Sequence, residues 1–246
     1  GGGGGGSGGG GHPKSLARVG SRFGDATSQP LLTIEAPRRS SRAQLATVGL
    51  LLWLYLLDKL VAEAWLTSAP IVTAQLFGWR EEQVGLFLCL VCAGVLPASQ
   101  VCRVAFARVP QHNRERTIID VMLLLVLCGG LLLLCYAPPF DRTAEPAYLA
   151  GAVIFFLANN LLEAATMSLL SKKMPKSWAG GVLNSGFLTT VTGLGGRVLG
   201  NLIVTLLGRV GPRLLNDSLM VPLYVLWVIT IALICSFGNR LSVARS

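Results

Sequence analysis

Three ionisable side chains lie inside the first apolar stretch of the chain. The run LLLWLYLLDKLVAEAWL, from residue 50 to 66, contains Asp58, Lys59 and Glu63. An ionisable side chain at the bilayer centre costs on the order of 2.5–3.5 kcal/mol on insertion scales, so such residues face a bundle interior or a wet cavity. Lys59 and Glu63 are four positions apart and share one helix face, where they can pair. The pattern has two interpretations: an ion pair that only fixes helix packing, or a cation and an acid lining a solute path.

The fourth apolar stretch carries amides and a carboxyl. In FFLANNLLEAATMSLL, the side chains of Asn159, Glu163 and Thr166 share one helix face. The amides can simply form interhelical hydrogen bonds. An unpaired carboxylate in lipid instead tends to take up a proton, and a carboxyl that changes protonation state suits proton-coupled transport. Glu163 is therefore a candidate for charge balance or proton coupling.

The fifth apolar stretch, GGVLNSGFLTTVTGLGGRVLGNLIVTLLG from residue 180 to 208, is rich in glycine. Gly196 and Gly200 form a GxxxG pair, a motif of low specificity that lets another helix approach closely. A neighbouring face carries a polar stripe that includes Arg197. A guanidinium presents a fork of donors that suits phosphate or carboxylate. The alternative is a salt bridge from Arg197 to Glu163 or Glu63. The stripe consists of Thr190, Arg197, Asn201 and Thr205.

The other classical chemistries are absent from the sequence. It has no GxSxG, HExxH or P-loop motif, so we expect no enzyme and no cofactor. Six cysteines lie in apolar runs without a second pair at zinc spacing, so we interpret them as small apolar packing residues and expect no metal site. The net charge of +9 does not form a basic face with aromatic platforms, so nucleic acid is not an expected partner. The cysteines are Cys89, Cys92, Cys102, Cys128, Cys135 and Cys235.

The composition indicates an all-α protein that spans a membrane several times. Hydrophobic residues make up 52% of the chain and charged residues 13%, against about 25% charged in soluble domains. Six apolar stretches each reach the ~20 residues that a helix needs to cross the hydrocarbon core, and strand periodicity is absent. Pro97 inside the second stretch predicts a kink. The predicted membrane helices are 45–70, 84–107, 117–137, 147–170, 179–207 and 219–238.

The segments outside the bundle predict two tails and an orientation. Residues 1–44 begin with GGGGGGSGGGG and continue with Ser, Pro and Arg, a composition that predicts disorder. Residues 239–246 form a short basic tail. Loops rich and poor in Lys and Arg alternate along the chain, which predicts that both termini are cytosolic.

Ordered motifs along the bundle resemble a known family. The chain is similar, over about residues 50–236, to the carboxyl-terminal half of plant and algal major facilitator transporters that carry an SPX domain, the vacuolar phosphate transporters. The resemblance rests on the Glu63 segment leading into FGW at 77–79, on VLP at 95–97, and on the two longer runs LLEAATMSLLSKKM (161–174) and LNSGFLTTVTGLGGRV (183–198). Six helices equal half of a twelve-helix facilitator.

The resemblance implies a solute, a location and a set of matching residues. The solute would be inorganic phosphate and the membrane that of the vacuole. The chain departs from the family where it has Ser68 in place of an acid, Asn201 in place of an aspartate, and Thr190–Gly193 in place of a Thr-Glu-Ala-Gly run. The matching residues are Glu63, Glu163, Asn184, Gly186, Gly193 and Arg197.

We therefore predict a six-helix bundle that forms half of a facilitator and takes part in the passage of an anion, most simply phosphate, across a vacuolar or other internal membrane. Substrate sites of facilitators lie between two halves, so an amino-terminal half or a second copy is an expected partner, beside membrane lipid. The alternatives are a non-transporting scaffold that binds a full-length facilitator through its GxxxG face, and a facilitator for another small solute. In the predicted site, Lys59 and Arg197 attract the anion, Asn159, Asn184 and Thr190 supply hydrogen bonds, and Asp58, Glu63 and Glu163 balance charge or carry protons.

Overall fold

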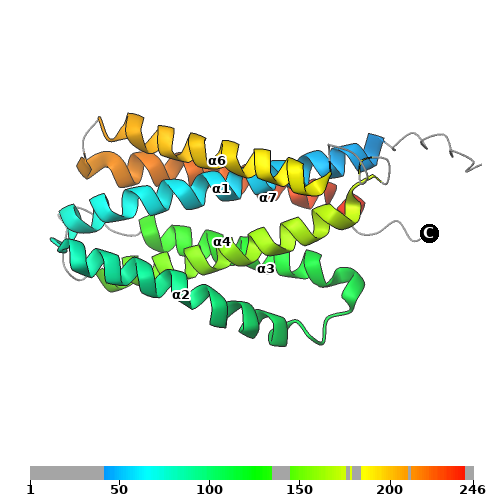
Figure 1. Cartoon of the computed structure of the whole chain (residues 1–246), viewed down its shortest axis with the longest axis horizontal. Coiled ribbons are helices and arrows are strands. Elements are labelled where there is room, and N and C mark those ends of the chain that lie inside the picture. Colours follow the sequence, from blue (N-terminus) through cyan, green and yellow to red (C-terminus); the bar gives the residue numbers. More distant parts are fainter. Residues whose placement is uncertain (1–41, 135–144, 176–177, 179–183, 210–211, 242–246) are drawn as a thin grey trace, which may run out of the picture. The chain divides into compact units, whose positions relative to one another are not determined.

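The computed structural model describes residues 42–134, 145–175, 178, 184–209 and 212–241. These residues form six helices, and no strand occurs among them. All six helices are long and apolar enough to cross a membrane, which confirms the predicted fold class of an all-α membrane protein. The helices are α1 (Arg42–Leu76), α2 (Glu81–Ala105), α3 (Gln111–Leu134), α4 (Glu145–Lys173), α6 (Ser185–Leu207) and α7 (Pro212–Leu241), and Figure 1 shows their course.

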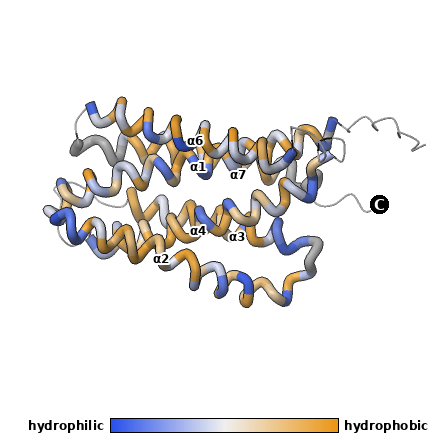
Figure 2. Tube along the Cα trace, viewed as in Figure 1, coloured by the Kyte–Doolittle hydropathy of each residue, from blue (hydrophilic) through white to orange (hydrophobic). Residues whose placement is uncertain are grey.

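The helix ends differ from the predicted stretches. α1 continues through Pro70 and ends six residues later at Leu76. α2 continues through Pro97. α6 begins only after Asn184, whose side chain caps the helix, whereas the prediction began at residue 179. The predicted tail of residues 1–44 lies almost entirely outside the described residues, which begin within it at 42. Figure 2 shows hydrophilic residues at the starts of α2 and α3 and mainly hydrophobic residues along the rest of these helices.

Glycines bring two pairs of helices into close contact. The α3–α4 and α1–α6 contacts are the most extensive in the bundle. A Cβ on Gly129 of α3 would lie 2.7 Å from the backbone nitrogen of Phe155 in α4, and one on Gly151 of α4 would lie 2.8 Å from Leu132 Cβ. These distances are shorter than van der Waals contact, so both helices approach each other as only glycine allows.

The α1–α6 pair uses the predicted GxxxG motif. A Cβ on Gly196 would lie 2.7 Å from the backbone oxygen of Leu56, and a Cβ on Gly200 would lie 2.6 Å from that of Leu60. α1 also contacts α2, α4 and α7. Because α1 is held on several sides, the side chains that it carries are positioned by the packing of the whole bundle.

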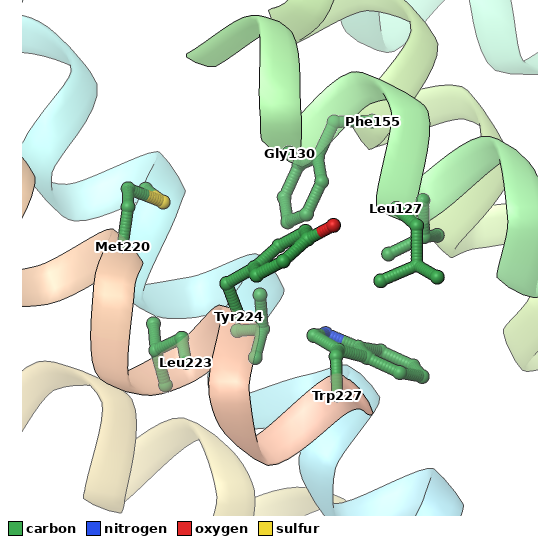
Figure 3. A pocket seen from close by; sticks show the side chains of 9 residues that line it. Leu127, Gly130, Phe155, Met220, Leu223, Tyr224 and Trp227 are labelled. Atoms are coloured by element: carbon green, nitrogen blue, oxygen red, sulfur yellow. The ribbon is translucent and has the colours of Figure 1, made fainter. Parts of the chain in front are cut away.

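The core between α1, α3, α4 and α7 is apolar and filled. Trp65 is completely buried, with its ring centroid 5.4 Å from that of Phe156. Figure 3 shows Phe155, Tyr224 and Trp227 among the residues that line a crevice in this core. The free space there is about 10 Å³, room for one water molecule at most. This crevice is therefore a packing defect and not a site for a solute.

Two helices leave most of their apolar surface uncovered. Much of α2 and α6 is exposed, and these faces can meet lipid or further helices, since lipid and protein interiors are similarly apolar. The exposed large apolar residues on the two helices include Leu86, Leu90, Leu96, Val101 and Val104 in α2, and Val191, Leu194, Val198, Leu202 and Leu206 in α6.

Candidate solute-binding site

An ion pair between α1 and α4 forms the centre of the candidate site. The Lys59 ammonium lies 2.5 Å from Oε2 of Glu163, and the two side chains are 13% and 22% exposed. The sequence placed Lys59 and Glu63 on one helix face where they can pair. In the structure the lysine instead pairs across to another helix. Because both side chains keep some exposure, the ion pair is not fully desolvated in the core. Each charge can therefore exchange its partner for another ion or for water.

Tyr55 completes this cluster from the turn of α1 that precedes Lys59. Its hydroxyl donates to Oε1 of Glu163 over 3.5 Å, and the Lys59 ammonium lies 5.8 Å from the centre of its ring. Gly193 of α6 faces the ring, since a Cβ on this glycine would lie 3.1 Å from the Tyr55 ring. The glycine thus provides the space in which Tyr55 can reach Glu163.

A hollow of about 280 Å³ opens beside this cluster, between α1 and α6. It has room for several waters, or for a small anion with part of its hydration shell. The residues that line it are Tyr55, Lys59, Thr189, Thr190, Gly193, Leu194 and Arg197.

Arg197 supplies the second positive charge of the hollow. Its side chain is exposed, and no salt bridge involves it within the part of the chain that the structure describes. The salt bridge that the sequence offered as an alternative, to Glu163 or Glu63, is therefore not formed. Since Glu163 balances the charge of Lys59, the hollow keeps the uncompensated charge of Arg197. A guanidinium with free donors beside an ammonium is suited to bind an oxyanion.

Thr190, which is predicted to supply a hydrogen bond to the solute, lines the hollow, but its hydroxyl already donates its hydrogen to the helix backbone. It donates to the backbone oxygen of Gly186 over 2.8 Å, and the neighbouring Thr189 hydroxyl donates to the backbone oxygen of Ser185 over 2.9 Å. The donors that remain for an anion come from Arg197 and Lys59.

Two predicted hydrogen-bonding residues lie elsewhere. Asn184 caps α6 by accepting from the backbone nitrogen of Phe187 over 2.8 Å, and it does not line the hollow. Asn159 is buried between helices and donates to the backbone oxygen of Asp58 over 3.1 Å. Both amides therefore hold the fold together in this structure and do not face the space for a solute.

Glu63 takes part in a separate polar cluster further along the α1–α6 contact. The Asn201 amide donates to Oε1 of Glu63 over 3.3 Å, and the Thr67 hydroxyl donates to Oδ1 of Asn201 over 2.7 Å. Asn201 therefore satisfies an acid and a hydroxyl at once, which an aspartate at this position cannot do because it lacks the donor.

Asp58 does not join either cluster. Its side chain is buried at 1% exposure, and neither carboxyl oxygen has a hydrogen-bond partner among the described residues. From the sequence, Asp58 is expected to lie next to the face that Lys59 and Glu63 share and to balance charge there. One residue of α-helix turns about 100°, and this turn carries Asp58 away from the hollow.

Sequence reasoning missed Tyr55 and Thr189. Tyr55 lies four positions before Lys59, so the helical spacing that joined Lys59 to Glu63 also pointed to Tyr55. Thr189 carries no comparable signal, because its position next to Thr190 does not reveal that it faces the hollow unless the rotation of α6 is known.

Comparison with known proteins finds similarity to membrane proteins of plants. The chain is similar to SPX domain-containing membrane proteins of plants. It is 28% identical over 195 residues to each of two such proteins of Arabidopsis thaliana, covering 79% of this chain and 27% of the relative. A protein of Oryza sativa subsp. indica with the same description is 28% identical over 197 residues, 78% of this chain and 27% of its own length.

The chain thus spans about a quarter of the length of the curated relatives that it matches. No protein-family profile matches the chain. No solved structure matches it either. The six membrane-length helices and the names of the relatives support a multi-pass membrane protein, similar in sequence to the plant SPX domain-containing membrane proteins.

Proposed function

We propose that the hollow between α1 and α6 binds a small inorganic anion, phosphate in the first instance, and that the bundle takes part in moving this anion across an internal membrane such as that of the vacuole. The observation that supports the proposal most strongly concerns Arg197, which lies on a membrane-length helix and lines the same open hollow as Lys59. Arg197 has no acid partner among the described residues. Phosphate is suggested by the resemblance of the sequence to the vacuolar phosphate transporters.

The ion pair of Lys59 with Glu163 suits reversible binding. An anion that enters the hollow competes with Glu163 for the ammonium, while the guanidinium of Arg197 holds it from α6. Release needs only the return of Lys59 to Glu163, which keeps the lysine from being left without a counter-charge. A site of this kind binds an anion without trapping it.

Only one wall of such a path is present in the bundle. The chain spans about a quarter of the length of its relatives, and the facilitator resemblance places a substrate between two halves. In our proposal the exposed faces of α2 and α6 meet the remaining helices of a complete carrier, either in the same longer protein or in a second copy.

The alternative of a scaffold that recruits a facilitator through the GxxxG face receives no support from the geometry. Gly196 and Gly200 already lie against the backbone of α1 in the same chain. A partner helix could use them only after α1 moved away from its closest neighbour.

The proposal is tested with the purified chain in detergent and in liposomes. Labelled phosphate should bind the wild-type chain, and Arg197→Ala should weaken binding on the order of tenfold to a hundredfold, because a hydrogen bond to a charged group contributes about 1.5–3 kcal/mol. Arg209→Ala is the matched control, since this exposed arginine follows α6 outside the hollow. We expect it to bind within about twofold of the wild type, because it changes only screened surface charge.

Flux separates transport from binding. Phosphate uptake into liposomes that contain the chain should exceed uptake into empty vesicles if the chain assembles a complete path. Equal binding by the Arg197 and Arg209 variants would refute the assignment of the hollow. Competition by sulfate, organic anions and sugars on the same preparation distinguishes phosphate from another solute.

A further inference from the structure

Among the residues that the structure describes, Asp58 is a buried acid whose surroundings the anion site does not explain. It lies near the middle of α1, and the side chain is 1% exposed. Neither of its oxygens meets a hydrogen-bond donor among the residues that the structure describes. An ionised carboxylate without donors or a counter-ion in an apolar interior is very costly, so the group remains neutral by holding a proton.

No cation of the described part of the chain forms a salt bridge with Asp58. The charged groups whose fields reach it are Glu163 of α4 and Lys59, its neighbour in α1. Lys59 is engaged with Glu163. α2, α6 and α7 also pack against α1, and within their described residues none forms a salt bridge with Asp58.

Acceptors for a protonated carboxyl are present in the same interface. Asn159 of α4 donates its amide hydrogen to the backbone oxygen of Asp58, while its own Oδ1 is buried and meets no donor among the described residues. The Thr166 hydroxyl on the same face of α4 is also buried without a partner in the described part of the chain. A neutral carboxyl has an O–H to donate and a carbonyl oxygen to accept, so this interface suits the protonated form.

We propose that Asp58 is a proton-binding site whose occupancy is coupled, through Lys59, to anion binding in the hollow between α1 and α6. The coupling follows from the charges, because Asp58 and Glu163 are two acids that both interact electrostatically with one cation, Lys59. One acid pairs with the ammonium and the other needs a proton to be neutral.

The coupling has a definite sign, and this part of the inference rests on the proposed function. An anion in the hollow interacts with the charge of Lys59 and adds a negative charge near Asp58 and Glu163. This added charge favours keeping a proton on one of the two acids. By thermodynamic linkage, a proton on one of these two acids then favours binding of the anion. When the O–H bond of Asp58 breaks, the proton passes to the Glu163 carboxylate or to water, and no other bond changes. Where Glu163 takes up the proton, the ionised Asp58 becomes the acid that balances the charge of Lys59.

The proton site is tested without any anion by infrared spectroscopy on the intact chain carrying ¹³C-labelled aspartate. Exposed aspartates have a pKa of about 3.9 and are ionised at pH 7. We expect an isotope-shifted band of a protonated carboxylic acid at pH 7 in the wild type and its loss in Asp58→Asn. Asp120→Asn, which changes a half-exposed carboxyl near Arg116 on α3, is the matched control and should keep the band.

The wild-type spectrum alone keeps the inference falsifiable even if Asp58→Asn fails to fold. Absence of a protonated-aspartate band at pH 7 overturns the proton site, and so does a band that persists in Asp58→Asn. Either result leaves phosphate binding by Arg197 unaffected.

The coupling is tested by phosphate binding at pH 6 and pH 8. We expect the wild type to lose more affinity than Asp58→Asn over this range, by about fivefold or more, which corresponds to the 1–3 kcal/mol typical of couplings between sites. The protonation of phosphate itself is common to both proteins and cancels in this comparison. Parallel pH profiles overturn the coupling, whereas absence of binding in both proteins contradicts the proposed function and leaves the infrared result standing.

Discussion

Replacing Gly196 with alanine tests whether close contact between α1 and α6 holds the anion site together. The added Cβ would lie 2.7 Å from the backbone oxygen of Leu56 and 2.8 Å from Cβ of Lys59. Ordinary contacts at such atoms begin near 3.4 Å, so the helices must separate by several tenths of an ångström. The backbone oxygen cannot move aside without moving α1, and the displaced segment includes the residue that pairs with Glu163.

The expected loss of stability follows from two opposing terms. Overpacking of a well-packed interface costs about 1–3 kcal/mol, while exchange of glycine for alanine inside a helix returns up to about 1 kcal/mol. We therefore expect Gly196→Ala to destabilise the bundle by about 1–2 kcal/mol. For a bundle of this size, 1 kcal/mol corresponds to a Tm change of about 2–4 °C.

Gly195→Ala is the matched control in the same helix. Its Cβ would lie 3.8 Å from Leu56 Cδ1, an ordinary contact, so we expect an unchanged or slightly higher Tm. Thermal unfolding of the detergent-solubilised variants, followed by tryptophan fluorescence or by loss of the monodisperse peak in size-exclusion chromatography, measures both. Equal shifts for the two variants would refute the conclusion that the GxxxG glycines are held against α1.

Two further predictions concern the polar clusters. Lys59→Gln should lower the stability by about 1–3 kcal/mol, because it leaves Glu163 without a counter-charge in a partly hydrated place. This loss is less than the roughly 3–5 kcal/mol expected when a fully buried pair is broken. The double variant with Glu163→Gln should recover stability but not phosphate binding, as measured by unfolding and by binding of labelled phosphate. Asn201→Asp should make the stability fall more steeply than in the wild type as the pH rises from 5 to 8. The cause is a second carboxylate about 3.3 Å from Glu63, since two like charges at this distance repel each other. Superimposable profiles of stability against pH for the two proteins would contradict the Glu63–Asn201 contact.

The number of membrane helices could be predicted from the sequence because it depends on local composition. Runs of about 20 apolar residues are sufficient to identify helices in a membrane, and all six appear in the structure. The helix ends were less predictable. Pro70 does not end α1, since the packing around a membrane helix can replace the backbone hydrogen bond that proline removes.

The partners of the charged residues could not be predicted, because they depend on how the helices rotate and pack. Lys59 and Glu63 share a helix face, yet Lys59 reaches Glu163 and Glu63 reaches Asn201. Asp58 is adjacent to Lys59 in sequence and is buried on another side of α1. Spacing within one helix states which residues share a face, but it does not say which neighbouring helix that face meets.

The same limit applies to the glycines. The GxxxG motif in α6 has a recognisable spacing within one helix. Gly129 and Gly151 instead belong to two helices that approach each other, and a single glycine on each carries no spacing signal. Their role follows only from the distances across the α3–α4 contact.

The central claim is that the hollow between α1 and α6 is a positively charged, water-accessible site that an anion can occupy. It is tested most directly by placing one cysteine at Thr190, which lines the hollow, in a chain whose native cysteines have been replaced, and by measuring its rate of modification with thiol reagents of opposite charge. We predict that the anionic reagent reacts faster than the cationic one, that phosphate slows the reaction, and that Arg197→Ala removes both effects. Equal rates for the two reagents, with no protection by millimolar phosphate, would contradict an anion site in this hollow.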